Sequence, residues 1–291
     1  MLRKTGDLDD HRLVHFAVYN GLPGRRGELD DYSPEGLTAL SDLDRSTLRE
    51  LDGVEAADDV DRVTIAAMRE RLGVGLDLAD AGEDLRSLNN IDSPVQTLRD
   101  GFDNLPTATG EDWADFASAL RAVPRALDQY ARSLRLARSR GDVAARRQVG
   151  AAISQARDQA GEATSSYTAL IDGAATADGA PLPPALAAEL REAAAVARRG
   201  YARLADFLAE EILPAAGRAD AVGRERYERF SREFLGAVVD LDETYEWGRE
   251  RLAAIDAEQR TIAERLYGPG TGVREAVDRL NADYSDRKSV V

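Results

Sequence analysis

Apolar residues recur at every third or fourth position along almost the whole chain, and this spacing limits its fold more than any other feature. An apolar period of about 3.6 residues is typical of amphipathic α-helices. No stretch shows the two-residue alternation of a half-buried strand. The sequence therefore predicts an all-α protein, a bundle of roughly nine to eleven helices with long antiparallel pairs. The five clearest stripes are Leu120, Val123, Leu127, Ala131 and Leu134; Val149, Ile153, Ala156, Ala160, Tyr167 and Ile171; Leu186, Leu190, Ala197, Tyr201, Leu204 and Leu208; Tyr227, Phe230, Phe234 and Val238; and Leu252, Ile255, Ile262 and Leu266.

Residues typical of helix ends lie at the edges of these stripes. Ser, Thr and Asp cap helix N-termini, proline suits the first helical position, and glycine ends helices. Pro124 instead lies inside the pattern at 110–140. It predicts a kink or a break, because proline has no N–H to bond the Leu120 carbonyl. The predicted caps are Ser33, Ser93 with Gln96, Thr109 with Asp112, and Asp240, and the predicted stop is Gly268-Pro269-Gly270.

The domain organisation is predicted to be simple. Residues 1–291 are expected to form a single helical domain, because no repeat of fixed period is visible. The best internal linker is the segment 172–184, DGAATADGAPLPP. Its Pro and Gly content suits either a hairpin loop or a joint between subdomains.

Composition excludes several classes of function. The chain has no cysteine, which excludes disulfides, thiolate catalysis and cysteine-based metal sites. A net charge of -15 argues against nucleic acid as a partner. No apolar run approaches the ~20 residues that span a bilayer, so no membrane association is expected. The N-terminal sequence is interrupted by acids and lacks the apolar core of a secretory signal, which predicts a cytoplasmic protein.

The two histidines are the first candidates for metal chemistry. His11 and His15 are four residues apart, so a helix would place them on one side. The glutamate that activates water in a zincin is replaced by Arg12, whose charge would repel a cation. We therefore interpret this segment as an ordinary amphipathic helix, with a metal role as the alternative.

Acidic groups and glycine loops have similar ordinary explanations. The densest carboxylate groups are Glu210-Glu211 and the set Asp240, Asp242 and Glu243. Such groups can hold hard cations or transfer protons, but helix surfaces and first turns explain them equally well. Glycines at 268, 270 and 272, and the pair Gly73 and Gly75, lack the Lys-Ser/Thr of a phosphate loop, which makes them helix terminators.

Basic residues are concentrated in one segment. Residues 121–147 carry eight arginines against Asp128 and Asp142. Arg121, Arg125, Arg132 and Arg135 are spaced to share one helical face. This face could bind anions or acidic substrates, but more often such a face is solvated or pairs with acidic helices of the same protein.

Several segments together resemble the actinobacterial branch of the bacterial "domain of unknown function 885" family. The resemblance covers nearly the whole chain, and it depends on the order and spacing of segments rather than on one motif. The segments are 29–36 (LDDYSPEG), 93–106, 109–127 (TGEDWADFASALRAVPRAL), 146–161, 224–248 and 255–270 (IDAEQRTIAERLYGPG).

This resemblance implies a mostly helical, metallopeptidase-like fold about twice as long as this chain. The family's zinc motif, His-Glu-x-x-Pro-Gly-His-His, belongs to the C-terminal half and occurs nowhere in this sequence. The chain therefore resembles the N-terminal half. No catalytic, cofactor-binding or metal-binding residue can be assigned to it, and zinc is expected only in the other half.

Three functional hypotheses follow. The first is the substrate-groove half of a hydrolase that acts on peptide-like substrates, inactive alone and partnered by a C-terminal catalytic half or by self-association. The second is a standalone helical interaction or scaffold module. The third is an independent enzyme that uses carboxylates and a borrowed metal.

Overall fold

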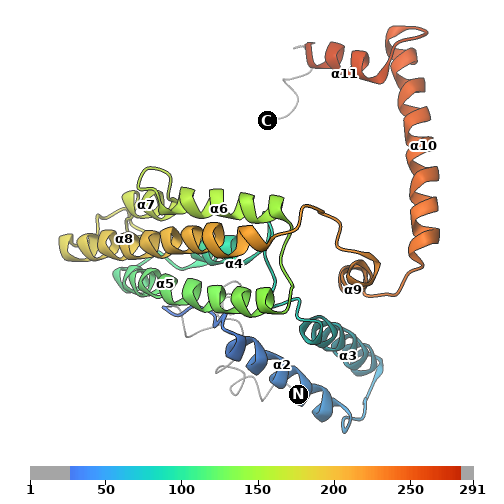
Figure 1. The fold of residues 1–291 in the computed structure, drawn as a ribbon. Helices are drawn as coiled ribbons and strands as arrows, with labels where there is room; N and C mark the ends of the chain where they lie inside the picture. Colours follow the sequence, from blue (N-terminus) through green and yellow to red (C-terminus); the bar gives the residue numbers. More distant parts are fainter. Residues whose placement is uncertain (1–26, 283–291) are drawn as a thin grey trace. The chain divides into compact units, whose positions relative to one another are not determined.

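Residues 27–282 are described by a computed structural model, and they form ten α-helices (Figure 1). No strand is present among these residues, where the only β-type pairing is an isolated bridge between Ala175 and Pro181. The prediction of an all-α bundle of roughly nine to eleven helices is therefore confirmed. The chain divides into two compact units, residues 1–229 and 230–291.

The first unit contains most of the helices. They are α2 (Pro34–Leu51), α3 (Asp59–Asp80), α4 (Pro94–Asp100), α5 (Gly110–Ser139), α6 (Arg146–Ala160), α7 (Ser166–Asp172), α8 (Pro184–Phe207) and the start of α9 (Arg224–Leu235). Three short helical turns accompany them: η3 (Gly101–Asn104), the π-helical turn η4 (Leu208–Ile212) that continues α8, and η5 (Leu213–Ala215).

The predicted caps are present at the helix ends. The Ser33 hydroxyl accepts a hydrogen bond from the Gly36 N–H at 3.1 Å. Gln96 Oε1 accepts one from the Ser93 N–H at 3.0 Å, and Thr109 and Asp112 bond each other reciprocally at the start of α5. These side chains satisfy N–H groups that the first helical turn leaves unpaired, which is why the helices begin at these residues.

Helix α5 has 30 residues and contributes more buried residues to the first unit than any other described helix. Pro124 does not break it, and the helix is continuous from Gly110 to Ser139. Its buried residues pack mainly against α8, and Gly200 of α8 lies directly over Pro124. Ion pairs between Arg121 and Glu189 and between Asp128 and Arg203 show that α5 and α8 run parallel.

Helix α5 and helix α8 are parallel because α6, which follows α5 in the sequence, runs in the opposite direction to both (Figure 1). In space, α8 packs against α5 and against α6. The pair α2 and α3 is antiparallel, which fits the general prediction of long antiparallel pairs, and ion pairs join Arg45 to Asp80 and Arg69 to Asp52 across it.

The segment 172–184 connects α7 to α8 inside the first unit. The Trp113 indole N–H donates to the Ala175 carbonyl at 3.0 Å, and the Ala177 N–H donates to the Ala108 carbonyl at 2.9 Å. These bonds fix the loop to the start of α5.

An aromatic cluster fills the core where α4, α5, α7 and α8 meet. The Phe102 ring lies edge-on to Phe116 and to Tyr167, with centroids 5.1 and 5.0 Å apart. The buried hydroxyl of Tyr201 donates to the Val95 carbonyl at 3.1 Å. Among residues 27–282, the buried Tyr167 hydroxyl has no hydrogen-bond partner of normal geometry. Burial raises the pKa of both phenols, so both stay protonated at neutral pH.

Substitution by phenylalanine should change the free energy of unfolding differently at these two tyrosines. Tyr201→Phe is expected to lower the free energy of unfolding by about 1 kcal/mol, because the Val95 carbonyl loses its donor. Tyr167→Phe should leave it unchanged or raise it by up to about 1 kcal/mol, because an unpaired buried hydroxyl is removed. Urea denaturation of both variants checks this, and equal losses would contradict the assignment.

The second unit is described over residues 230–282. It contains the end of α9, the long helix α10 (Leu241–Tyr267) and α11 (Val273–Ala282). The Asp240 carboxylate caps α10 by accepting from the N–H groups of Asp242 and Glu243 at 2.9 and 3.1 Å. The helix ends at Gly268, whose φ of 99° lies in the left-handed region that glycine tolerates. Both predicted ends of α10 are therefore confirmed.

The two predicted apolar stripes in the second unit differ from those in the first. Phe234 and Val238, and Leu252, Ile255 and Leu266 on α10, are all exposed. The helical period is confirmed up to Phe234 and along α10, whereas Val238 lies in the loop after the end of α9 at Leu235. The described part of the unit provides no core for these side chains.

Candidate functional site

A buried carboxylate is placed at the end of α3 by a helix-terminating motif. Gly82 has a φ of 73°, which is left-handed, and its N–H donates to the Ala79 carbonyl at 2.9 Å. The next N–H, of Glu83, donates to the Leu78 carbonyl at 3.0 Å. This is the Schellman pattern of hydrogen bonds, which requires glycine at the left-handed position. It turns the Glu83 side chain into the protein, where it is 3% exposed.

Helix α5 ends in the same way. Gly141 has a φ of 85°, and its N–H donates to the Arg138 carbonyl at 3.0 Å. The Asp142 N–H then donates to the Ala137 carbonyl at 3.0 Å. Two long helices therefore end in the same motif, and an acidic residue follows the glycine in each.

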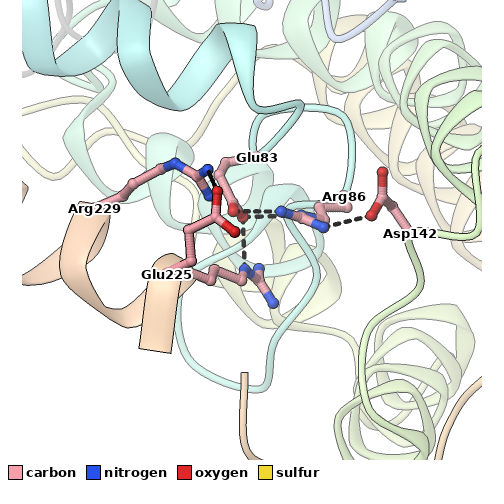
Figure 2. Close-up of polar contacts among 6 residues, drawn as sticks. Glu83, Arg86, Asp142, Glu225 and Arg229 are labelled. Atoms are coloured by element: carbon pink, nitrogen blue, oxygen red, sulfur yellow. Dashed lines mark hydrogen bonds and ion pairs between the residues drawn. The ribbon is translucent and has the colours of Figure 1, made fainter. Parts of the chain in front are cut away.

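Arg86 joins the two acids (Figure 2). Its Nε and Nη2 donate to the two carboxylate oxygens of Glu83 at 3.0 and 2.5 Å, and its Nη1 donates to Asp142 Oδ1 at 2.6 Å. Arg226, in the first turn of α9, donates from Nε to Glu83 Oε2 at 2.7 Å. We call Glu83, Arg86, Asp142 and Arg226 the Glu83 cluster.

The contacts within the Glu83 cluster stabilise the charged forms of Glu83 and Arg86. Burial alone would raise the pKa of Glu83, but the hydrogen bonds and charges of Arg86 and Arg226 lower it below its usual value. Hydrogen bonding to Glu83 raises the pKa of Arg86, against the effect of burial. A general acid or base needs a pKa near the working pH. The cluster is therefore suited to joining the ends of α3 and α5 to the start of α9, and not to proton transfer.

Sequence reasoning missed the Glu83 cluster, although part of the signal was visible. Both Gly82-Glu83 and Gly141-Asp142 follow a helical pattern and match the end of a helix with an acid one position later. The pairing of these two ends through Arg86 depends on tertiary structure.

The arginine-rich face of α5 is occupied by acids of the same unit. Arg121 pairs with Glu189 at 2.8 Å, and Arg132 donates to both oxygens of Glu35 at 2.8 Å. Arg135 forms two hydrogen bonds to Glu211, at 3.0 and 2.7 Å, and lies over the Phe207 ring. Pairing with acidic helices, one of the two interpretations of this face, is therefore confirmed for these arginines.

The acidic groups that the sequence analysis singled out do not come together in one site. Glu211 is the partner of Arg135, which lowers its pKa, and Asp240 is the cap of α10. His11 and His15 lie outside the described residues. Within residues 27–282, no group of three His, Asp or Glu side chains has a geometry that could hold a metal ion.

An open cleft of about 200 Å³ lies between α2, α3 and the end of α5. Its lining includes Ser41, Arg45, Asp80 and Arg140, and Arg45 and Asp80 form an ion pair at 2.5 Å. Pockets for small ligands usually enclose roughly 300–1,000 Å³. The cleft is small by that measure, and both charges of this pair are already compensated.

No helix within residues 27–282 is both long enough and apolar enough to cross a membrane.

Comparison with known proteins places the chain in a family. A crystal structure described as "the putative lipoprotein from Colwellia psychrerythraea" matches with a TM-score of 0.74 at 15% identity, over 93% of this chain and 51% of that one. This chain therefore spans about half the length of that structure, and at such low identity the match shows the fold alone. No curated protein matches the chain. The family model for bacterial proteins of unknown function, DUF885, matches residues 15–290. The chain belongs to the DUF885 family.

Proposed function

We propose that this chain is the helical, substrate-groove half of a metallopeptidase-like hydrolase and is inactive alone. The observation that carries the proposal is the length of the structural neighbour, which has the same fold over 93% of this chain but is about twice as long. A zinc motif of the form His-Glu-x-x-Pro-Gly-His-His, absent from this sequence, would belong to the other half. In this proposal the present chain binds and orients a peptide-like substrate, and the other half supplies the metal.

The ionisable side chains of the first unit support this division of roles. The carboxylates of the Glu83 cluster and Glu211 are held by arginines. The tyrosines at the core have raised pKa values and stay protonated. These groups stabilise a scaffold, and a scaffold is what the substrate-binding half of a hydrolase would provide.

A standalone interaction module is the second candidate. The specific observation in its favour is the exposed apolar face of α10, which suits binding to another helix. The cytoplasmic location stays a prediction, and the structural neighbour is described as a "putative lipoprotein".

The hydrolase proposal is tested by supplying the other half. The purified chain is expected to hold no stoichiometric zinc and to show no chelator-sensitive hydrolysis of peptides. Mixed or coexpressed with the C-terminal half of a full-length DUF885 protein, it should give chelator-sensitive hydrolysis that neither half shows alone. Elemental analysis that finds one tightly bound zinc in the isolated chain would contradict the proposal and direct attention to His11 and His15. Two halves that stay inactive together would favour the interaction module.

A further inference from the structure

Helix α10 is long, and little of its surface is buried by other residues of its unit. It has 27 residues, and Ala263 is its only buried residue. A helix in water obtains most of its stability from packing of its apolar face against other elements. Helix α11 contacts α10 near its C-terminal end, where the Arg279 guanidinium lies over the Tyr267 ring. Within their own unit, the described residues leave most of the apolar face of α10 uncovered.

The uncovered face has the spacing of a coiled coil. Positions 241, 245, 248, 252, 255, 259, 262 and 266 are separated alternately by four and three residues, which is the a/d spacing of a heptad repeat. Gly248 and Gln259 occupy two of the positions. Apolar residues occupy the other six, and the five after the first are between 37% and 67% exposed: Leu241, Tyr245, Leu252, Ile255, Ile262 and Leu266. We call these eight positions the α10 seam. A seam of this kind packs lengthwise against one other helix.

The α10 seam is complementary to itself when one copy is reversed. In an antiparallel pair, Leu252 would face Ile255 of the second copy, and the same register would match Tyr245 with Ile262. The two positions that are not large and apolar would also meet, since Gly248 would face Gln259 and leave room for the longer side chain. At the ends, Leu241 would face Leu266. One register therefore matches all eight positions.

The charges beside the α10 seam match in that register as well. Arg249 would face Asp256 of the second copy, and Arg251 would face Glu258. Symmetry repeats each pair, so the arrangement brings opposite charges together four times. A parallel pair would instead place Gln259 against Gln259, and only Arg251 would approach an acid, Asp256. Flanking charges set partner choice and orientation in coiled coils, so these favour the antiparallel form.

We infer that α10 binds α10 of a second copy of this chain as an antiparallel two-helix coiled coil. The inference goes beyond the proposed function, because it needs neither a substrate nor another half. The net charge of -15 on each chain opposes association at long range. At physiological ionic strength this repulsion is screened beyond about 8 Å, so contacts within the α10 seam decide the outcome.

Charge reversal on the full chain tests the inference. Sedimentation in 0.15 M salt, roughly physiological, should show a reversible dimer. The double variant R249E/R251E should raise the dimer dissociation constant about tenfold or more, because four attractions become repulsions. The control R191E/R199E makes the same change in net charge on exposed positions of α8 and should leave the constant unchanged.

The complementary variant makes the test specific. D256R/E258R alone should dissociate like R249E/R251E, whereas an equimolar mixture of the two should form dimers as readily as the unmodified chain. Circular dichroism should show unchanged helix content in each variant, because none of the altered residues is buried.

Orientation can be read from cysteine crosslinks, since the chain has no natural cysteine. An equimolar mixture of L252C and I255C chains should oxidise mainly to the mixed disulfide, because these positions face each other only in the antiparallel pair. A monomer at all concentrations, a dimer indifferent to charge reversal, or disulfides mainly between identical chains would overturn the inference. None of these results would affect the hydrolase proposal, which is decided by activity of the combined halves.

Discussion

Replacing Glu83 with alanine is expected to lower the free energy of unfolding by about 3 kcal/mol, since it breaks a buried ion pair from one side. The Glu83 carboxylate is 3% exposed and receives hydrogen bonds from both Arg86 and Arg226. Without it, two guanidinium groups lose their shared partner. Arg86 keeps its bond to Asp142, and Arg226 is 26% exposed. These remaining contacts place the loss at the lower end of the range for buried pairs.

An exposed ion pair provides the matched control. Glu189 pairs with Arg121 at 2.8 Å, but both side chains are nearly half exposed. Glu189→Ala should therefore cost no more than about 0.5 kcal/mol. Urea denaturation followed by circular dichroism measures both variants. Equal, small losses would show that the Glu83 cluster does not anchor the helix ends.

A second variant, Glu83→Gln, tests the pH dependence of stability, because the pKa of Glu83 is lower in the folded chain than its usual value of 4.5. Between the folded and the unfolded pKa, the unfolded chain binds more protons than the folded one, so stability rises with pH there. The contribution of Glu83 is thus complete above its unfolded pKa and is lost as pH falls through its folded pKa. The difference in stability between the unmodified chain and Glu83→Gln should narrow below about pH 4.5.

Most helix ends were predictable because the signals are local, but the prediction that Gly73 and Gly75 end a helix was wrong, since both lie inside α3. A cap such as Ser33 or Asp240 accepts hydrogen bonds from N–H groups two or three residues away. The sequence around the helix end therefore suffices to predict it. The apolar period likewise depends on a single helix. The direction of α8 relative to α5 is not local, because it depends on how α6 and α7 return the chain. The sequence therefore predicted long antiparallel pairs, such as α2 with α3, but not that α5 and α8 run parallel.

The Glu83 cluster was beyond sequence reasoning for the same reason. Glu83 and Arg86 are near neighbours, but Asp142 and Arg226 come from distant segments. Among many surface acids, nothing in the sequence marks Glu83 as buried. The α10 seam shows the opposite case, because its spacing is fully visible in sequence while its exposure depends on what else packs there.

The second large effect on stability is expected for Gly200→Ala. The backbones of α5 and α8 approach closely at Pro124 and Gly200. A Cβ atom added at Gly200 would lie 3.0 Å from the Pro124 Cα and 3.3 Å from its Cβ and Cγ. The Cα is backbone and cannot rotate away, and the proline ring is rigid. Gly200→Ala should therefore force α8 away from α5, with an overpacking cost of about 1–3 kcal/mol.

Alanine also improves helix propensity, and this gain has to be measured separately. Gly150, in α6, is a suitable reference, because a Cβ added there meets no atom within 4 Å. Gly150→Ala should raise the free energy of unfolding by about 1 kcal/mol, the usual gain inside a helix. Gly200→Ala has the same gain but also the contact with Pro124, so it should be about 1–3 kcal/mol less stable than Gly150→Ala. If the two variants proved equally stable in urea denaturation, the α5–α8 contact would be loose enough to admit a methyl group. The glycine would then reflect sequence history and not the packing of this pair.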